Sequence, residues 1–217
     1  KDTDWVENLI TLPAADSETA QKLSSLKGLS FNTVSIQPVF LKMNGGKGAA
    51  LRAGFAASSG DFVLLLDGDL DINPKQTAEF FFEMSRHNAD VVVGSRYVQG
   101  VNVVNWPMSR LLMSYCASQY VRLITRMPVC DATAGFVCYS RRALQTLNLD
   151  QVKMKGYGFQ IEMKYSAWRL GLKVSEVSII FVDRVVGTSK MSSGIFGEAF
   201  WGVLKLPFRR IQPRKVV

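Results

Sequence analysis

The alternation of apolar and polar residues along the chain predicts strands and helices in turn. Apolar or β-branched runs of strand length cover residues 8–13, 31–41, 61–67, 89–96, 134–144 and 173–184. Stretches with a helical period, several of them ending at a glycine, cover residues 16–28, 50–60, 74–88, 109–127 and 159–171. The two kinds of segment follow one another along most of the chain.

This order predicts an α/β fold, because strands joined through helices of this length form right-handed crossovers. We expect a mostly parallel sheet with helices on both faces. The run DFVLLLD (61–67) is almost continuously apolar, as in a strand covered on both faces. Pro38 predicts an edge or a break in its strand. Asp67 and Arg96 lie at the carboxyl ends of predicted strands, where ligands bind in such sheets.

The helix predicted at 109–127 has an unusually wide apolar surface. Its polar stripe consists of Arg110, Ser114, Ser118 and Arg122, four residues apart, and apolar residues occupy most of the remaining circumference. Such a surface requires cover from a core, a partner or lipid.

Composition favours a globular protein of one domain. The chain has 217 residues, 47% of them hydrophobic, and a formal net charge of +8. The charge predicts an anionic partner, such as nucleic acid, an anionic membrane surface or a phosphorylated substrate. Aromatic residues are not interleaved with Lys and Arg, which argues against nucleic acid. No stretch reaches the roughly 18 uncharged apolar residues that a spanning helix needs.

Cysteine and histidine are scarce. Three cysteines without ligand-like spacing and a single histidine exclude a zinc set. We expect Cys116, Cys130 and Cys138 to be small buried residues in a protein from a reducing compartment.

Three aspartates lie at the carboxyl end of the predicted strand at 61–67 and just beyond it. Gly68 and Pro74 indicate that the chain turns there, which would let the carboxylates of Asp67, Asp69 and Asp71 converge. Crowded carboxylates repel one another unless a cation lies between them, and hard oxygen ligands suit Mg²⁺ or Mn²⁺. The alternative is a solvated acidic turn without a ligand.

Six segments between roughly residues 44 and 195 follow one another in a characteristic order: GKGAALRAGF, GDFVLLLDGDLDINP, VVVGSRY, DATAGFVCYSRRAL, GYGFQIEM and FVDRVVGTSKM. By these segments the chain resembles the family 2 glycosyltransferases, in particular the polyprenyl (dolichyl) phosphate mannose synthases. It implies a GT-A type nucleotide-sugar-binding fold and transfer of a hexose from a nucleoside diphosphate sugar to a lipid phosphate. It also implies that Asp67 and Asp69 form the family's metal-binding DxD, and that Asp71 replaces a glutamine of many relatives.

The resemblance implies roles for five further residues. Arg96 and Arg110 match arginines around the acceptor phosphate, as forked cationic donors suit a phosphate. Arg184 and Lys190 match a basic pair near the donor diphosphate, and Glu162 matches a position turned toward the active site. Because a lipid phosphate is already a nucleophilic anion, no strong general base is required. An in-line displacement predicts an inverting enzyme, with a β-linked product from an α-linked donor.

The N-terminal part matches the family weakly, at Pro13, Asp16 and Ser17, so one strand–helix unit is altered or missing. The donor therefore stays open between GDP-mannose, which we favour, UDP-glucose and other sugar nucleotides. We divide the chain into a GT-A-like catalytic domain, 1–191, and an amphipathic, basic C-terminal segment, 192–217. On that segment Ile195, Phe196, Ala199, Phe200, Val203 and Leu204 share one helical face beside Trp201.

This face could contact lipid or pack on a core. The lipid interpretation predicts a peripheral protein on the cytoplasmic face of a membrane, alone or with a small membrane subunit. Two other functions stay open: a family 2 glycosyltransferase with a soluble or polysaccharide acceptor, and a degenerate relative without catalysis.

Overall fold

The computed structural model describes residues 6–12, 30–31, 34–43, 45–66, 76–182 and 193–214. The chain forms two compact units, Lys1–Asp61 and Phe62–Val217. Among the predicted elements, the helix at 16–28 lies outside the described residues.

The first unit contains a small three-stranded sheet and one helix. β1 (Val6–Leu12) pairs in parallel with β3 (Val34–Phe40), and β2 (Ser30–Phe31) pairs with the start of β3 in antiparallel fashion. Pro38 lies opposite Ile10 of β1, beyond the two β3 residues that β2 reaches. α2 (Gly46–Ala57) buries Ala50 and Phe55, which confirms a helix in this region.

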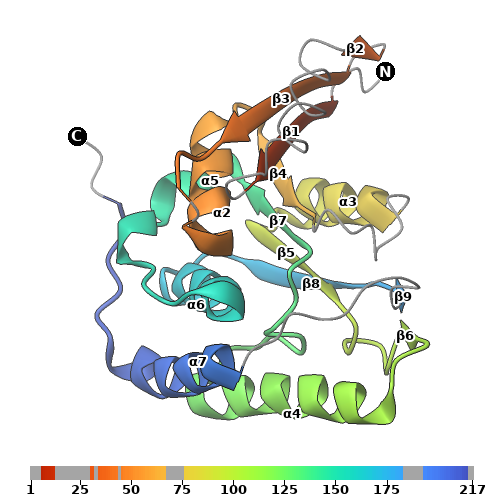
Figure 1. Cartoon of the computed structure of the whole chain (residues 1–217). Helices are drawn as coiled ribbons and strands as arrows, with labels where there is room; N and C mark the ends of the chain where they lie inside the picture. The colour runs from red at the N-terminus through yellow and green to blue at the C-terminus, as the bar shows by residue number, and fades with distance from the viewer. Residues whose placement is uncertain are drawn as a thin grey trace. The chain divides into compact units, whose positions relative to one another are not determined.

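The second unit is built on a four-stranded sheet (Figure 1). The strand order is β4 (Phe62–Leu65), β7 (Val137–Ser140), β5 (Val91–Ser95) and β8 (Val174–Ser178). β5 and β8 are parallel, but β7 is antiparallel to both of its neighbours, so this sheet is mixed rather than mostly parallel. The chain reaches β7 from the end where β5 finishes, because the segment just before β7 hydrogen-bonds there, from Gly94 N–H to the Phe136 carbonyl.

One part of the core of this unit lies between the sheet and α3 (Thr77–His87). All five residues of β5 are buried, and Phe80 of α3 packs against Phe136 with ring centroids 4.4 Å apart. Gly94 lies within this packing: a Cβ there would be 2.8 Å from Phe136 and 2.9 Å from Phe80. The four residues of β4 are only partly buried, so the predicted cover on both faces of that strand is incomplete.

The remaining helices are α4 (Met108–Thr125), α5 (Arg141–Thr146), α6 (Gly156–Arg169) and α7 (Ser193–Lys205), with short 3₁₀ turns η2 (Leu149–Gln151) and η3 (Leu206–Phe208). Two short strands, β6 (Val103–Val104) and β9 (Phe181–Val182), pair in parallel. α7 packs against both α4 and α6, and it lies beside α4 in Figure 1. In the described ranges no helix is both long and apolar enough to span a bilayer.

By packing, the C-terminal segment belongs to the second unit. Arg209 hydrogen-bonds Glu162 of α6 and donates to the Gln151 carbonyl at 2.6 Å, and the backbone N–H of Arg214 donates to the Thr146 carbonyl at 2.8 Å. Val203 and Leu206 are buried, whereas Phe200 and Trp201 are exposed. The segment therefore packs on the core with one side and presents aromatic side chains to solvent with the other.

Candidate functional site

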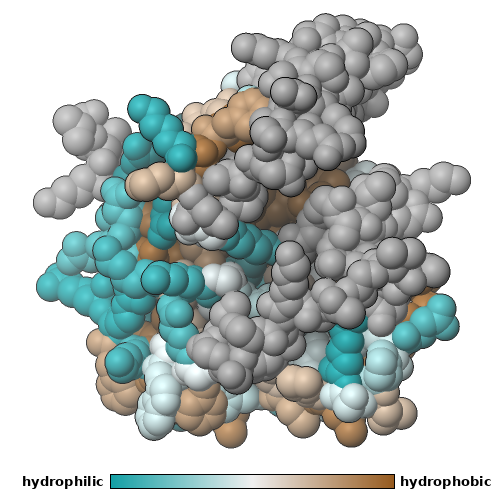
Figure 2. Space-filling view, viewed as in Figure 1, coloured by the Kyte–Doolittle hydropathy of each residue, from teal (hydrophilic) through white to brown (hydrophobic). Residues whose placement is uncertain are grey.

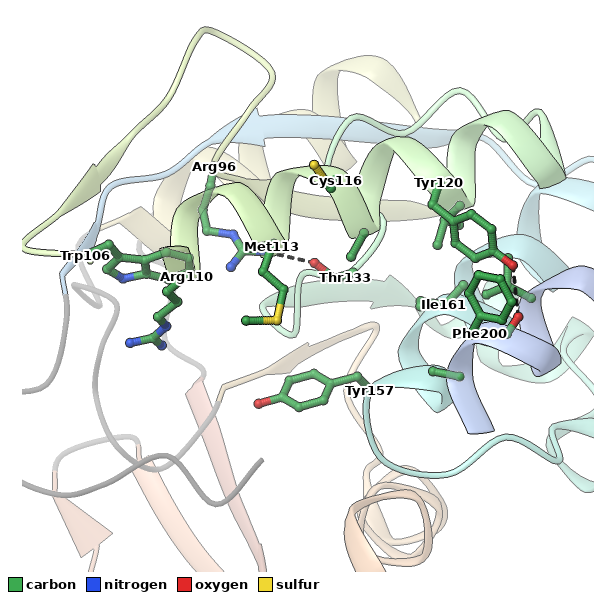
Figure 3. A pocket seen from close by; sticks show the side chains of 15 residues that line it. Arg96, Trp106, Arg110, Met113, Cys116, Tyr120, Thr133, Tyr157, Ile161 and Phe200 are labelled. Carbon is green, nitrogen blue, oxygen red and sulfur yellow. Dashed lines mark hydrogen bonds between the residues drawn. The ribbon is translucent and has the colours of Figure 1, made fainter. Parts of the chain in front are cut away.

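A cavity of about 460 Å³ lies between α4, α6, α7 and two loops of the second unit (Figure 3). Most of the side chains that line it are apolar, but two of them are arginines. The residues that line it include Arg96, Trp106, Arg110, Tyr120, Tyr157 and Phe200.

Arg96 follows β5 directly and is held in a buried ion pair. Its Nε and Nη2 donate to the two carboxylate oxygens of Asp131 at 2.6 and 2.7 Å, and Nη2 also donates to Thr133 Oγ1 at 3.0 Å. The backbone N–H of Arg96 donates to the same carboxylate at 3.0 Å. Asp131 has no exposed side-chain surface, so the guanidinium group is fixed in one orientation.

The pair shifts the pKa of both partners. Burial by itself would lower the pKa of Arg96, but the hydrogen bonds and the negative charge of Asp131 outweigh burial and raise it. Burial would likewise raise the pKa of Asp131, but the hydrogen bonds and the charge of Arg96 lower it below the ordinary value. Both groups are therefore charged at neutral pH.

Hydrogen bonds to a residue of β8 hold the loop that carries Asp131. The backbone N–H groups of Cys130 and Asp131 donate to the carboxylate of Glu176 at 2.6 and 2.9 Å. Because Glu176 lies on β8, this contact ties the counter-ion of Arg96 to the sheet.

Arg110 lies in the first turn of α4 and shares an aromatic neighbour with Arg96. Its guanidinium carbon is 4.2 Å from the centre of the Trp106 ring, and that of Arg96 is 5.3 Å from the same ring. Both distances fall within cation–π range. Trp106 thus brings the two cationic groups to one end of the cavity, as Figure 3 shows.

The opposite end of the cavity is aromatic. The rings of Tyr120 on α4 and Phe200 on α7 are stacked, with centroids 4.8 Å apart and an angle of 9° between their planes. The Tyr120 hydroxyl also donates to the Phe200 carbonyl at 3.0 Å. This pair joins α4 to α7 and leaves an apolar space between itself and the two arginines (Figure 3).

Helix α4 turns polar side chains toward the protein and apolar side chains toward solvent. Three of the four residues of the predicted polar stripe face inward: Arg110 and Ser114 line the cavity, and Ser118 is fully buried. The fourth, Arg122, is partly buried. Ser114 accepts a hydrogen bond from the Tyr97 hydroxyl at 2.8 Å. The apolar residues of the outer side are exposed; they are Met108, Leu112, Tyr115 and Leu123. We call these four residues the outer face of α4.

Glu162 does not line this cavity. Its side chain is buried, and its carboxylate accepts from the backbone N–H groups of Lys153 and Met154, each at 2.8 Å, and from Arg209. The described contacts thus make Glu162 an anchor between α6 and the C-terminal segment.

The other predicted site residues cannot be placed in this geometry. Asp67, Asp69, Asp71, Arg184 and Lys190 lie outside the residues that the structure describes. Sequence reasoning missed Asp131 and Tyr157, although both lie in segments that carry the family resemblance. The available signal for Asp131 was physical, because a buried arginine needs a counter-ion. Cys116 was predicted to be buried, but it lies on the exposed part of α4 and lines the cavity.

Residues 16–147 match the family model described as glycosyl transferase family 2. Two similar proteins are an undecaprenyl-phosphate mannosyltransferase from Micrococcus luteus, 39% identical over 163 residues, and a polyprenol monophosphomannose synthase from Mycolicibacterium smegmatis, 38% identical over 166 residues. The alignments cover 74% and 73% of this chain, and 66% and 62% of those relatives.

Solved structures of glucosyl-3-phosphoglycerate synthase from Mycobacterium tuberculosis share the fold. The complex with Mn²⁺, uridine diphosphate and glucosyl-3-phosphoglycerate has a TM-score of 0.60 at 17% identity, and the complex with phosphoglyceric acid has 0.58 at 18%. Each comparison covers 91% of this chain and 66% of the other. The predicted α/β, GT-A type fold is confirmed. From the family model, which covers more than half of the chain, we conclude that this protein belongs to glycosyl transferase family 2.

Proposed function

We propose that the chain carries the catalytic domain of a polyprenyl-phosphate hexosyltransferase. It would move a hexose, mannose in our preferred assignment, from a nucleoside diphosphate sugar such as GDP-mannose to polyprenyl phosphate. Support comes from two relatives, 39% and 38% identical, which are named undecaprenyl-phosphate mannosyltransferase and polyprenol monophosphomannose synthase.

The observation that carries the proposal is the chemical division of the cavity. A polyprenyl phosphate has an anionic head and a long apolar tail. The cavity offers guanidinium groups from Arg96 and Arg110 at one end and apolar side chains over the rest of its length. This arrangement suits a lipid phosphate better than a small soluble acid, whose polar groups would be left without partners along the apolar part.

The two arginines would contribute differently. The charge of Arg96 is compensated by Asp131, so Arg96 mainly offers a fixed donor. Its Nε and Nη2 are engaged in the hydrogen bonds described above, which leaves Nη1 to donate to a phosphate oxygen. Arg110 would offer a second guanidinium group to the anionic head, and its position against Trp106 restricts its movement.

The proposed reaction is a single displacement. An acceptor phosphate oxygen forms a bond to the anomeric carbon as the bond from that carbon to the donor diphosphate breaks, and the configuration is inverted. The nucleophile is already anionic, so no residue needs to remove a proton from it. The engaged carboxylate of Glu162 is consistent with this, and we give Glu162 no part in the chemistry.

We assign the donor side by the family positions. Asp67, Asp69 and Asp71 would hold Mg²⁺ or Mn²⁺, which neutralises charge on the departing diphosphate when bound. Arg184 and Lys190 would contact the same diphosphate. Support for an ion comes from the hard carboxylate oxygens of the three aspartates and from a fold shared with a Mn²⁺ complex.

The outer face of α4 is proposed to rest on a membrane surface. Leu123 is 77% exposed and Met108 66%, an arrangement that would be costly on a face in contact with water alone. Trp201 and Phe208 add exposed aromatic groups from the neighbouring segment, with basic residues Lys205 and Arg210 beside them. In Figure 2, apolar residues gather along the lower edge of the molecule, where Figure 1 draws α4 and α7.

We assign this surface to the cytoplasmic leaflet, where nucleotide sugars are available; a small membrane subunit would be a second way of holding the enzyme there. The best alternative function is transfer to a soluble phosphorylated acid, because the fold is shared with a phosphoglycerate enzyme.

A transfer assay tests the proposal directly. The protein is incubated with radiolabelled GDP-mannose, UDP-glucose and other sugar nucleotides, Mg²⁺ or Mn²⁺, and a short polyprenyl phosphate, followed by extraction into organic solvent. We expect label from one donor in the organic phase, in a β-linked product. Asp69→Ala should abolish transfer, and Arg110→Ala should raise the KM for the acceptor at least about tenfold. Transfer to phosphoglycerate with none to polyprenyl phosphate would refute the proposal.

A further inference from the structure

Tyr157 is the cavity residue that α6 contributes from its first turn. It is the second residue of α6 and lies between Gly156, which has a φ of +53°, and Gly158. A Cβ on Gly158 would be 2.7 Å from the end of the Met154 side chain, so the backbone packs closely at this point. The two glycines therefore set the path of the chain on either side of Tyr157.

The side chain of Tyr157 enters the cavity from the side opposite α4. In Figure 3 its ring extends from α6 and its hydroxyl is directed toward the end of the cavity that holds Arg96 and Arg110. The protein covers the side chain only in part, since the residue is 45% exposed. Its oxygen is near enough to Arg96 to contribute to the raised pKa of that arginine, after Asp131 and Tyr97.

The hydroxyl of Tyr157 has no hydrogen-bond partner among the described residues. The cavity's other tyrosine, Tyr120, donates to a carbonyl, and the neighbouring Tyr97 donates to Ser114. Because the residue is 45% exposed, water can accept from this hydroxyl until a ligand enters the cavity. A bound ligand could replace that water, and the nearby guanidinium groups select an anionic one.

We infer that Tyr157 is an acceptor-binding residue that donates a hydrogen bond to the phosphate of the bound polyprenyl phosphate, from the side opposite Arg96 and Arg110. This inference rests on the proposed function. The two arginines hold the phosphate from the side of α4 and the end of β5, and Tyr157 holds it from α6. Three donors from different elements fix the orientation of a phosphate, which two arginines next to one tryptophan do not.

Binding of farnesyl phosphate and farnesol separates the head from the tail. Kd values are measured by calorimetry for the wild type, Tyr157→Phe and Tyr165→Phe. Tyr165 is a matched control, because it lies on the same helix, outside the cavity, and its hydroxyl accepts from Arg169 at 2.7 Å. We expect Tyr157→Phe to weaken farnesyl phosphate binding about tenfold and to leave farnesol binding within about twofold. Tyr165→Phe should change neither Kd.

Steady-state kinetics provides the second measurement. Tyr157→Phe should raise the KM for the acceptor phosphate and leave the KM for the donor nucleotide sugar unchanged. Equal affinity of wild type and Tyr157→Phe for farnesyl phosphate would overturn the inference and leave the proposed function standing, and so would a change confined to the donor KM. A wild type that binds farnesyl phosphate no better than farnesol would overturn the proposed function together with the inference.

Discussion

The charge on Asp131 controls the orientation of Arg96, although the two residues are 35 positions apart in the sequence. Asp131→Asn keeps the shape of the side chain but leaves the buried guanidinium without its counter-charge. Breaking a buried pair in this way costs about 3–5 kcal/mol. We therefore expect the free energy of unfolding at pH 7, measured with urea, to fall by an amount in this range.

The same pair predicts a pH dependence. The pKa of Asp131 is lower in the folded protein than in the unfolded chain, so the stability that the pair contributes is present above the unfolded pKa, about 4. It is lost as the pH falls through the lower, folded pKa. The difference in unfolding free energy between wild type and Asp131→Asn should thus be constant near neutrality and shrink below about pH 4. A difference that stays constant down to pH 3 would contradict this assignment.

Cys116 offers a chemical probe of the cavity. It lines the cavity and is exposed, whereas burial raises the pKa of the Cys138 thiol to about 12 and that of Cys130 above its ordinary value. N-ethylmaleimide should modify Cys116 first. Farnesyl phosphate should slow this modification at least about fivefold if the tail occupies the cavity. Mass spectrometry of the labelled peptides reads the result, and labelling at an unchanged rate under saturating ligand would argue against that position of the tail.

At the scale of single elements, β5 depends on a residue without a side chain. Gly94→Ala would place a Cβ within 3 Å of the rings of Phe136 and Phe80, deep in the core. Overpacking of this kind costs about 1–3 kcal/mol, and we expect a corresponding loss in urea-induced unfolding. Gly197→Ala on α7 is the control: nothing lies within 4 Å of its Cβ, so it should be neutral or stabilising by up to about 1 kcal/mol. An equal effect of both substitutions would contradict the packing argument.

The elements also show what the pattern of the sequence could and could not predict. Periodicity predicted two strands, β5 and β8, and three helices, α3, α4 and α6. Burial of one helix face, or of a whole strand, determines the spacing of apolar residues along the sequence. The antiparallel direction of β7 was not predicted, because a short apolar run does not indicate in which direction its strand runs. The polar stripe of α4 was predicted, but the pattern does not indicate which side of a helix faces the protein.

The site was predictable to a similar extent. Arg96 and Arg110 were found by their family positions, and the structure brings them to one end of a cavity. Asp131 and Tyr157 were missed, because an ion pair across 35 residues and a side chain aimed across a cavity depend on tertiary packing and have no local periodicity. Glu162 was selected by position alone, and its described contacts explain its burial through the anchoring of the C-terminal segment.

At the scale of the whole molecule, the outer face of α4 predicts binding to vesicles. Leu112→Glu and Leu123→Glu each replace an exposed apolar side chain with a charge. Each change removes roughly 2 kcal/mol of the favourable free energy of transferring a leucine side chain from water into lipid. We expect each to lower flotation with anionic liposomes at least about tenfold. Phe82→Glu on α3, where the phenylalanine is 50% exposed, is the matched control and should float like the wild type.

Equal loss in all three variants would point to general destabilisation, which unfolding curves would detect. Unchanged flotation in both α4 variants would contradict the proposed orientation on the membrane. Removal of the chain from residue 192 onward is a poorer test, because Val203 and Leu206 are part of the core of the second unit.

The exposed apolar side chains on the outer face of α4 would also determine how the enzyme meets its acceptor. A protein that lies with this helix along a bilayer meets its acceptor by lateral diffusion in a plane, and the head group needs to rise only as far as the guanidinium end of the cavity. Turnover would then follow the mole fraction of acceptor among the lipids, so that adding inert phospholipid at a fixed total amount of acceptor should slow the reaction by surface dilution.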